Sequence, residues 1–232
     1  MNDKLLGIIG GMGPEATAIF YGKLIENTKV RRDQDHFKVL IYSNPKIPDR
    51  TESILADGES PVPEIIKTGK ILEDMGAELL AIPCVTSHYY YAEIQEALAV
   101  KLINILEVLN EYIRLKNPEI KKVGILSTTG TRKTKLFDKY LKEYEIIYTD
   151  DNIQLDYIMK AIYDEEIGIK SGKKEGESKS LLLEAAKNLV DKGAECIILG
   201  CTEIGLAIGQ KDMETKVIDP LDTLALKMIG KI

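Results

Sequence analysis

Two cysteines in this chain stand where a thiol could exchange protons with a bound molecule. Cys84 and Cys201 each follow a short apolar run, and each is followed within two residues by a threonine, Thr86 and Thr202 respectively. A short apolar run predicts a buried strand, and open α/β sheets bind ligands at the carboxyl ends of their strands. A free thiol has a pKa near ~8.5, so it can act as a base or as an acid near neutrality. One thiol on each side of a carbon atom could remove a proton from one face and return a proton to the other, which inverts the stereochemistry without a cofactor.

The remaining cysteine and the two histidines indicate no metal site. Cys196 lies inside its apolar run and is interpreted as a buried, inert thiol. Zinc requires about four ligands, and the cysteines and histidines of this sequence do not form the necessary cluster, so no metal is expected. An odd number of cysteines, three here, is typical of free thiols inside the cell. His88 either orients a thiol or caps its helix, and His36 is expected at the surface.

Groups that bind carboxylates accompany the cysteines in the sequence. Thr86 and Thr202 stand where helices are expected to begin, and hydroxyls together with backbone N–H groups at such positions hold carboxylates and favour thiolates. Arg50 lies in a loop stiffened by proline, which suits bidentate capture of a carboxylate, although a loop arginine is usually only solvated. Lys170 could likewise either bind a carboxylate or be a solvated surface charge, as is expected of its neighbours Lys173 and Lys174.

A glycine-rich turn, residues 10–13, follows the first predicted strand. It lacks the G-x-G-x-x-G spacing of a dinucleotide-binding fingerprint, and no acidic residue closes a clear second strand at the expected distance. The turn is interpreted as a contact for a small anion, with a tight turn packed under the sheet as the alternative.

Strand and helix patterns alternate along the chain, which predicts an α/β architecture with mostly parallel sheets flanked by helices. The proline-containing segment 43–61 is expected to lack regular structure for much of its length and to form a functional loop, and Ser178 is expected to cap a helix. Strands are predicted at 4–9, 38–42, 78–82, 101–103, 122–126, 146–148, 196–199 and 217–218, and helices at 15–30, 63–75, 89–99, 106–116, 131–144, 153–167, 179–192 and 221–229.

The sequence matches itself in two separated places at a constant shift of 117 residues. Gly7 then aligns with Gly124, and Cys84 aligns with Cys201. The alternative is that all α/β units share a glycine after one strand and a helix before the next, but the constant register favours a duplication. Two similar halves that face each other would bring both thiols to opposite sides of one central cleft, where we expect the active site.

Composition and charge exclude several classes of protein. The net charge of −6 and the pI near 5.2 argue against a nucleic-acid partner, because a phosphate-binding face normally requires a basic excess. Hydrophobic content of 44% with 29% charged residues is typical of a globular protein and not of a disordered one. No apolar run approaches the roughly 20 residues that span a bilayer. We therefore expect a cytoplasmic protein without a membrane partner.

Five motifs in order resemble those of the aspartate/glutamate racemase superfamily, most closely its aspartate racemase and general amino-acid racemase branch. They lie at residues 8–17, 47–51, 82–88, 168–172 and 199–204, and the resemblance covers essentially the whole chain. It implies two pseudo-symmetric α/β domains, commonly a homodimer, and racemisation without pyridoxal or any other cofactor. It also implies that the C-terminal helix returns to the first domain, so the expected domains are 1–100 with 210–232, and 101–209.

The resemblance assigns roles to residues of this chain. Cys84 and Cys201 would be the two catalytic thiols. Arg50 and Lys170 would hold a side-chain carboxylate, which favours an acidic amino acid as substrate, aspartate before glutamate, because a neutral substrate would leave such cations without a counter-charge. The other expected substrate-binding residues are Met12, Gly13, Thr17, Val85, Thr86 and Thr202, and the candidate supporting residues are Ser87, His88 and Glu203.

One departure from the family's pattern bears on the substrate. The usual Cys-Asn-Thr triplet here reads Cys84-Val85-Thr86, which replaces an amide with an apolar side chain. A hydrogen bond to a charged group is worth about 1.5–3 kcal/mol, so either the substrate differs or Ser87 or a backbone N–H replaces the amide. The alternative functions are a decarboxylase or cis–trans isomerase of dicarboxylates on the same scaffold, and a non-catalytic amino-acid binder.

Overall fold

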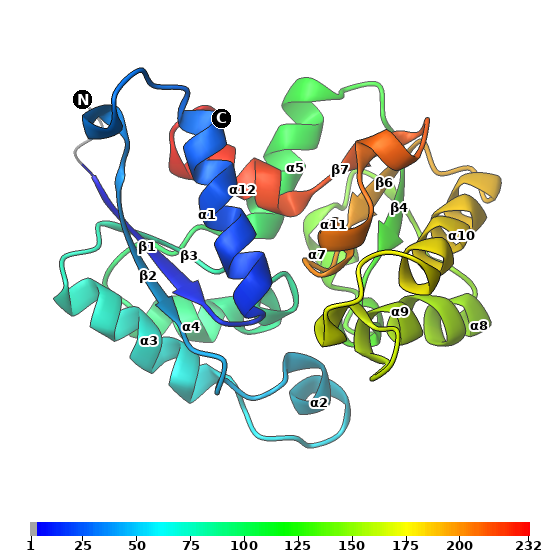
Figure 1. Ribbon diagram of the computed structural model, residues 1–232, viewed down its shortest axis with the longest axis horizontal. Coiled ribbons are helices and arrows are strands. Elements are labelled where there is room, and N and C mark those ends of the chain that lie inside the picture. The colour runs from blue at the N-terminus through cyan, green and yellow to red at the C-terminus, as the bar shows by residue number, and fades with distance from the viewer. Residues whose placement is uncertain (1–3) are drawn as a thin grey trace. The chain divides into compact units, whose positions relative to one another are not determined.

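The computed structural model describes residues 4–232 and divides into two compact units, each with its own parallel sheet (Figure 1). The described residues up to Glu111 together with Leu221–Ile232 form the first unit, and Tyr112–Pro220 form the second. The predicted α/β class, with two parallel sheets flanked by helices, is confirmed.

The unit boundaries lie at 111/112 and 220/221, whereas the expected domains divide at 100/101 and 209/210. The helix α5 (Ile105–Lys116) begins in the first unit, where Glu111 forms an ion pair of 2.5 Å with Lys227 of the C-terminal helix α12 (Pro220–Met228). This contact ties the first part of α5 to the first unit. Residues 1–3 of the expected first domain lie outside the described residues.

The first sheet has β1 (Leu5–Gly10) at its centre, with β2 (Lys38–Ser43) on one side and β3 (Leu79–Ala81) on the other. All three strands are parallel, and β1 is buried after its first residue. An isolated bridge between Leu80 and Leu102 lies where the short strand 101–103 is predicted.

The second sheet has the order β5-β4-β6-β7, again all parallel. Its strands are β4 (Lys122–Leu126), β5 (Glu145–Ile147), β6 (Cys196–Leu199) and β7 (Lys216–Ile218). The central pair β4 and β6 therefore corresponds to β1 and β3, and β5 corresponds to β2.

The shift of 117 residues holds at the level of single contacts. A Cβ added to Gly7 would lie 2.6 Å from Leu80 and 3.0 Å from Ala77, and a Cβ added to Gly124 would lie 3.0 Å from Ile197 and 2.9 Å from Ala194, which are the residues 117 positions later. These glycines therefore permit the same close approach of the central strands in both units. The predicted duplication is confirmed in the topology and in the packing.

Helices cover both sheets, and Figure 1 shows α12 beside α1 in the first unit, where Lys23 and Asp222 form an ion pair of 2.6 Å. The remaining helices of the first unit are α1 (Pro14–Thr28), η1 (Asp33–Asp35), α2 (Arg50–Leu55), α3 (Val62–Asp74), η2 (Thr86–Tyr90) and α4 (Tyr91–Ala97). Those of the second unit are α6 (Thr129–Lys133), α7 (Leu136–Tyr140), α8 (Asp151–Ile153), the π-helix η3 (Gln154–Met159), α9 (Lys160–Tyr163), η4 (Ile169–Ser171), α10 (Glu177–Asp191), α11 (Ile204–Ala207) and η5 (Gln210–Asp212).

Two local predictions were wrong. The helix predicted at 131–144 is broken into α6 and α7, because Lys135 adopts a left-handed conformation with φ of 50°. Ser178 does not cap α10, because Gly176 occupies the cap position. Ser178 lies in the first turn of the helix, and its hydroxyl donates to the carbonyl of Lys173 at 2.7 Å. Segment 43–61 lacks regular structure over much of its length, as predicted, and α2 lies within it.

Candidate active site

Cys84 lies in the connection between β3, which ends at Ala81, and the η2 turn, which begins at Thr86. Its side chain is 6% exposed, and the residues that follow it, Val85 to His88, are all buried. The helix predicted at 89–99 begins earlier, as the 3-10 turn η2, and continues as α4. The thiol of the first unit is therefore held by a short, tightly packed connection.

His88 holds the backbone that carries the Cys84 thiol. Its Nδ1 lies 2.9 Å from the carbonyl oxygen of Cys84, which can only accept, so the Nδ1 carries the proton. Burial lowers the pKa of His88 to about 4, and the ring is therefore neutral at pH 7. The ring also stacks on Tyr91, with a centroid separation of 6.1 Å. His88 thus positions the Cys84 main chain and does not contact its sulfur through this bond.

The glycine-rich turn after β1 is held by internal contacts. Gly11 has φ of +97°, and a Cβ there would lie 2.3 Å from the backbone of Asn44. The hydroxyl of Thr17 accepts a bond of 3.0 Å from the N–H of Gly11 and donates a bond of 2.9 Å to the carbonyl of Gly13. Both polar functions of Thr17 are therefore used within the turn, in agreement with the tight-turn interpretation.

Met12 connects this turn to the Cys84 segment. Its side chain is 3% exposed, and the hydroxyl of Ser87 donates to its sulfur at 3.5 Å. Because β1 and β3 are neighbouring strands, their carboxyl ends lie at the same edge of the sheet. The structure therefore brings Met12, Ser87 and Cys84 to one edge of the first sheet.

Arg50 opens the short helix α2, which Asp49 caps by accepting bonds from the N–H groups of the next turn. The Arg50 side chain is 9% exposed, and its Nη1 donates to the carbonyl of Pro48 at 2.9 Å. The hydroxyl of Ser53 lies 2.8 Å from that of Tyr90, which joins α2 to η2. The loop of the predicted arginine is therefore fastened to the turn that follows Cys84.

Cys201 lies beyond the end of β6 and contacts a carboxylate. Its Sγ donates to Oε2 of Glu203 at 3.0 Å, and the hydroxyl of Thr202 donates to the same oxygen at 3.1 Å. All three side chains are buried, with exposed fractions of 4–7%. The pKa of the Cys201 thiol is raised well above its usual value, first by burial, and then by the negative charge of Glu203 and the hydrogen bond to it. Thr202 would have to turn its hydroxyl away from Glu203 to donate to a substrate carboxylate.

Lys170 is exposed on η4, where its Nζ lies 4.5 Å from the centroid of the Tyr163 ring. Its positive charge acts on Cys201 in the direction opposite to the burial and to Glu203, toward the thiolate. The turn before it is built on Asp164, whose carboxylate accepts from the N–H groups of Glu166 and Ile167 at 2.9 and 3.1 Å. The structure therefore brings Lys170 within electrostatic reach of Cys201.

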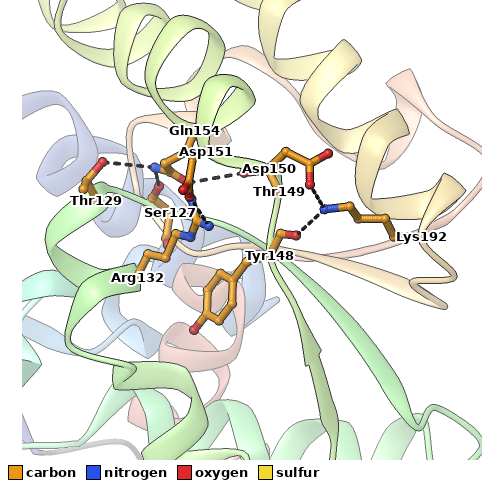
Figure 2. Close-up of polar contacts among 9 residues, drawn as sticks. All are labelled: Ser127, Thr129, Arg132, Tyr148, Thr149, Asp150, Asp151, Gln154 and Lys192. Atoms are coloured by element: carbon orange, nitrogen blue, oxygen red, sulfur yellow. Dashed lines mark hydrogen bonds and ion pairs between the residues drawn. The ribbon is translucent and has the colours of Figure 1, made fainter.

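A group of polar contacts at the ends of β4 and β5 was not predicted from the sequence (Figure 2). Its centre is Gln154, which is 2% exposed and donates to the carbonyl of Ser127 at 2.9 Å. The constant shift of 117 residues, which relates 10–14 to 127–131, could have found this loop. Since β4 pairs with β6, the loop lies at the same sheet edge as Cys201. The hydroxyls of Thr129 and Thr149 lie 3.4 Å from side-chain atoms of Gln154. Two separate groups of contacts lie beside them: Arg132 with Asp151, and Lys192 with Asp150 and the carbonyl of Tyr148.

The third cysteine lies apart from this chemistry. Cys196 is fully buried within β6, and burial raises its pKa to about 12, so its thiol stays protonated. Among residues 4–232, no group of three His, Cys, Asp or Glu side chains could hold a metal ion. Within the same range, no helix is long and apolar enough to cross a membrane.

Known proteins resemble this chain over nearly its full length. A family model described as Asp/Glu/Hydantoin racemase matches residues 9–228. The broad specificity amino-acid racemase RacX of Bacillus subtilis (strain 168) is 29% identical over 97% of both chains. Among solved structures, Picrophilus torridus aspartate racemase has a TM-score of 0.78 at 28% identity, covering 99% of this chain and 95% of its own. An aspartate racemase homologue from Pyrococcus horikoshii OT3 has a TM-score of 0.76 at 28% identity, covering 99% and 98%.

Proposed function

The chain belongs to the Asp/Glu/Hydantoin racemase family and is an isomerase, and from this premise we propose that it interconverts the L- and D-forms of an acidic amino acid, aspartate before glutamate. Cys84 and Cys201 act as the two acid–base groups, and no cofactor takes part. The family resemblance further suggests a cytoplasmic homodimer.

The observation that carries the proposal is the equivalent position of two buried, free thiols. Cys84 and Cys201 are 117 residues apart, and each lies just after a strand that pairs with the central strand of its own sheet. The third cysteine occupies a different position, inside β6. A duplicated thiol fits a reaction whose forward and reverse directions are mirror images.

Two thiols can complete this reaction by themselves. A thiolate takes the α-proton, the C–H electron pair stays on the α-carbon, and the opposite thiol gives its proton to the other face. The product leaves the two sulfurs with their protonation states exchanged. This route requires that the thiols act on opposite faces of the α-carbon.

Arg50 and Lys170 support an acidic side chain in the substrate. Each carries a positive charge; the helix of Arg50 is fastened to the turn after Cys84, and the charge of Lys170 acts on Cys201. A neutral side chain would offer these cations no counter-charge, whereas a carboxylate could accept a charge-assisted bond. Val85, which is 1% exposed, supplies no polar group, so backbone N–H groups or Ser87 would complete the recognition of the α-carboxylate.

A panel of amino acids in deuterated water tests the substrate. We expect loss of the α-proton NMR signal and formation of the D-enantiomer from L-aspartate, more slowly from L-glutamate, and least from L-alanine. Arg50→Gln and Lys170→Gln should raise KM for aspartate by roughly 10- to 100-fold, as expected for loss of a charge-assisted bond.

The exposed Lys173 offers a matched control, because Lys173→Gln removes the same charge from the same loop. We expect it to leave KM for aspartate unchanged. Faster exchange of alanine than of aspartate, or equal effects of Lys173→Gln and Lys170→Gln, would contradict the acidic specificity. Binding of aspartate without any solvent exchange would indicate a non-catalytic binder.

A further inference from the structure

The second unit carries a carboxylate beside its thiol, and the first unit has none at the equivalent position. The shift of 117 residues relates Glu203 to Thr86, and Thr202 to Val85. Glu203 is 7% exposed, and its Oε2 receives both the thiol of Cys201 and the hydroxyl of Thr202, at 3.0 and 3.1 Å. The duplication has therefore produced two different surroundings for two equivalent thiols.

These contacts favour one protonation state of Cys201. A thiol can donate to a carboxylate, whereas a thiolate beside the same carboxylate would place two negative charges within hydrogen-bond distance in a buried site. The bond from Thr202 fixes the orientation of the carboxylate, so it stays directed at the sulfur. Lys170 opposes this preference, but its Nζ lies on an exposed turn over the ring of Tyr163.

We propose that Glu203 is a positioning residue that keeps Cys201 in its protonated form, so that the second unit supplies the proton donor in the resting enzyme. The catalytic meaning of this assignment rests on the proposed function, whereas the location of the proton rests on the contacts of Glu203. When Cys201 gives its proton to the α-carbon, the S–H bond breaks, a C–H bond forms, and the sulfur is left as a thiolate beside Glu203. That state is disfavoured, so Cys201 regains a proton before the next turnover in the same direction.

The asymmetry has a defined kinetic limit. The equilibrium constant between enantiomers is one, so kcat/KM must be equal in the two directions for every variant. A substitution of Glu203 can therefore change kcat/KM only by one factor that is common to the two directions. A change in the ratio of the two kcat values, matched by the ratio of the two KM values, is the kinetic signature that we expect from Glu203→Gln.

Alkylation of the folded protein by iodoacetamide tests the location of the proton without turnover. The modification of each cysteine is followed by peptide mass spectrometry between pH 6 and 10.5. In the unmodified sequence, we expect Cys201 to react with a midpoint above the value of about 8.5 of an ordinary thiol. Glu203→Gln should lower this midpoint by at least one unit, which is about a tenfold faster reaction at pH 8, and Glu203→Asp should restore part of the original midpoint.

Two internal references make the result decisive. Glu184→Gln, on the exposed face of α10, makes the same charge change and should leave the Cys201 midpoint unaltered. The fully buried Cys196 reports unfolding, because it reacts only when the unit opens. An unchanged Cys201 midpoint in a folded Glu203→Gln protein would overturn the proposal. If that variant unfolds, the alkylation midpoint of Cys201 in the unmodified protein provides the test. A midpoint at or below about 8.5 would refute the proposal. Neither outcome depends on whether aspartate is the substrate.

Discussion

In the first unit a neutral histidine holds the backbone of Cys84, whereas in the second unit a carboxylate holds the thiol of Cys201 itself. The position that corresponds to His88 is Gly205, and both histidines of the chain lie in the first unit. The two units therefore stabilise their cysteine segments by unrelated means. A duplicated scaffold does not make the two thiols chemically equivalent.

At the amino ends of the same strands the units agree closely. Glu78 accepts a bond of 3.0 Å from the N–H of Leu5, and its counterpart Glu195 accepts one of 3.1 Å from the N–H of Lys122. The reverse backbone bonds measure 2.8 and 2.9 Å. Packing that supports the sheet has thus been retained in both copies, while the carboxyl ends, where ligands bind, have diverged.

The largest effect that separates the units is the acid sensitivity that the buried His88 gives to the first unit. The pKa of His88 is lowered by burial from 6.5 to about 4 in the folded state. Above pH 6.5 His88 is neutral in both the folded and the unfolded chain, so it does not change the free energy of unfolding there. Between pH 6.5 and 4 the imidazole binds a proton in the unfolded chain but stays neutral in the folded chain. As the pH falls toward 4, it lowers the free energy of unfolding by as much as about 3 kcal/mol. Native-state hydrogen exchange should locate the loss in the first unit.

His88→Gln should flatten this pH dependence, because the titrating group is gone. His36→Gln is the matched control, and it should leave the dependence in place. If His88→Gln retains the full loss of stability between pH 6.5 and 4, His88 is not the acid-sensitive group and the contrast between the units is wrong.

A smaller effect tests the similarity of the two scaffolds. A Cβ at Gly7 or at Gly124 would meet equivalent neighbours at 3.0 Å or less in both units. Gly7→Ala and Gly124→Ala should therefore each lower the stability of their own unit by about 1–3 kcal/mol, and by similar amounts. Hydrogen exchange of the amides in each sheet measures the two losses separately.

Gly22→Ala provides a control of opposite sign, because no atom lies within 4 Å of a Cβ at this position inside α1. It should raise stability by roughly 0.5–1 kcal/mol. A large loss at Gly7 with none at Gly124 would show that the close strand approach is not shared.

Most of the strand framework could be predicted from the sequence, because buried parallel strands are short apolar runs that need little tertiary context. The constant shift added the correspondence between β1 and β4 and between β3 and β6. The helix at 131–144 could not be predicted correctly, because its apolar spacing is helical and nothing local announces the left-handed Lys135. Ser178 has the residue type of a cap, but α10 begins at Glu177, one residue before it, and Gly176 takes the cap position.

The candidate site residues could be named from the sequence, but their hydrogen bonds could not. Cys84 and Cys201 follow from strand ends and the shift, but the sequence does not say which polar group reaches each cysteine. The bond from Cys201 to Glu203 depends on a side-chain rotamer, and the bond from Cys84 to His88 depends on the turn η2. The role of the buried Gln154 could not be predicted, because its side chain reaches from the π-helix η3 to the carbonyl of Ser127, 27 residues earlier in the chain.

The most direct test of the two-thiol account is the racemisation rate of single-cysteine variants. Cys84→Ala and Cys201→Ala should each lower racemisation of aspartate by roughly 10³-fold or more, with the fold retained, since each removes one of two acid–base groups. Cys196→Ala, which removes the inert buried thiol, should keep a rate near that of the unmodified sequence. Turnover of either Cys84→Ala or Cys201→Ala at the unmodified rate would contradict the account.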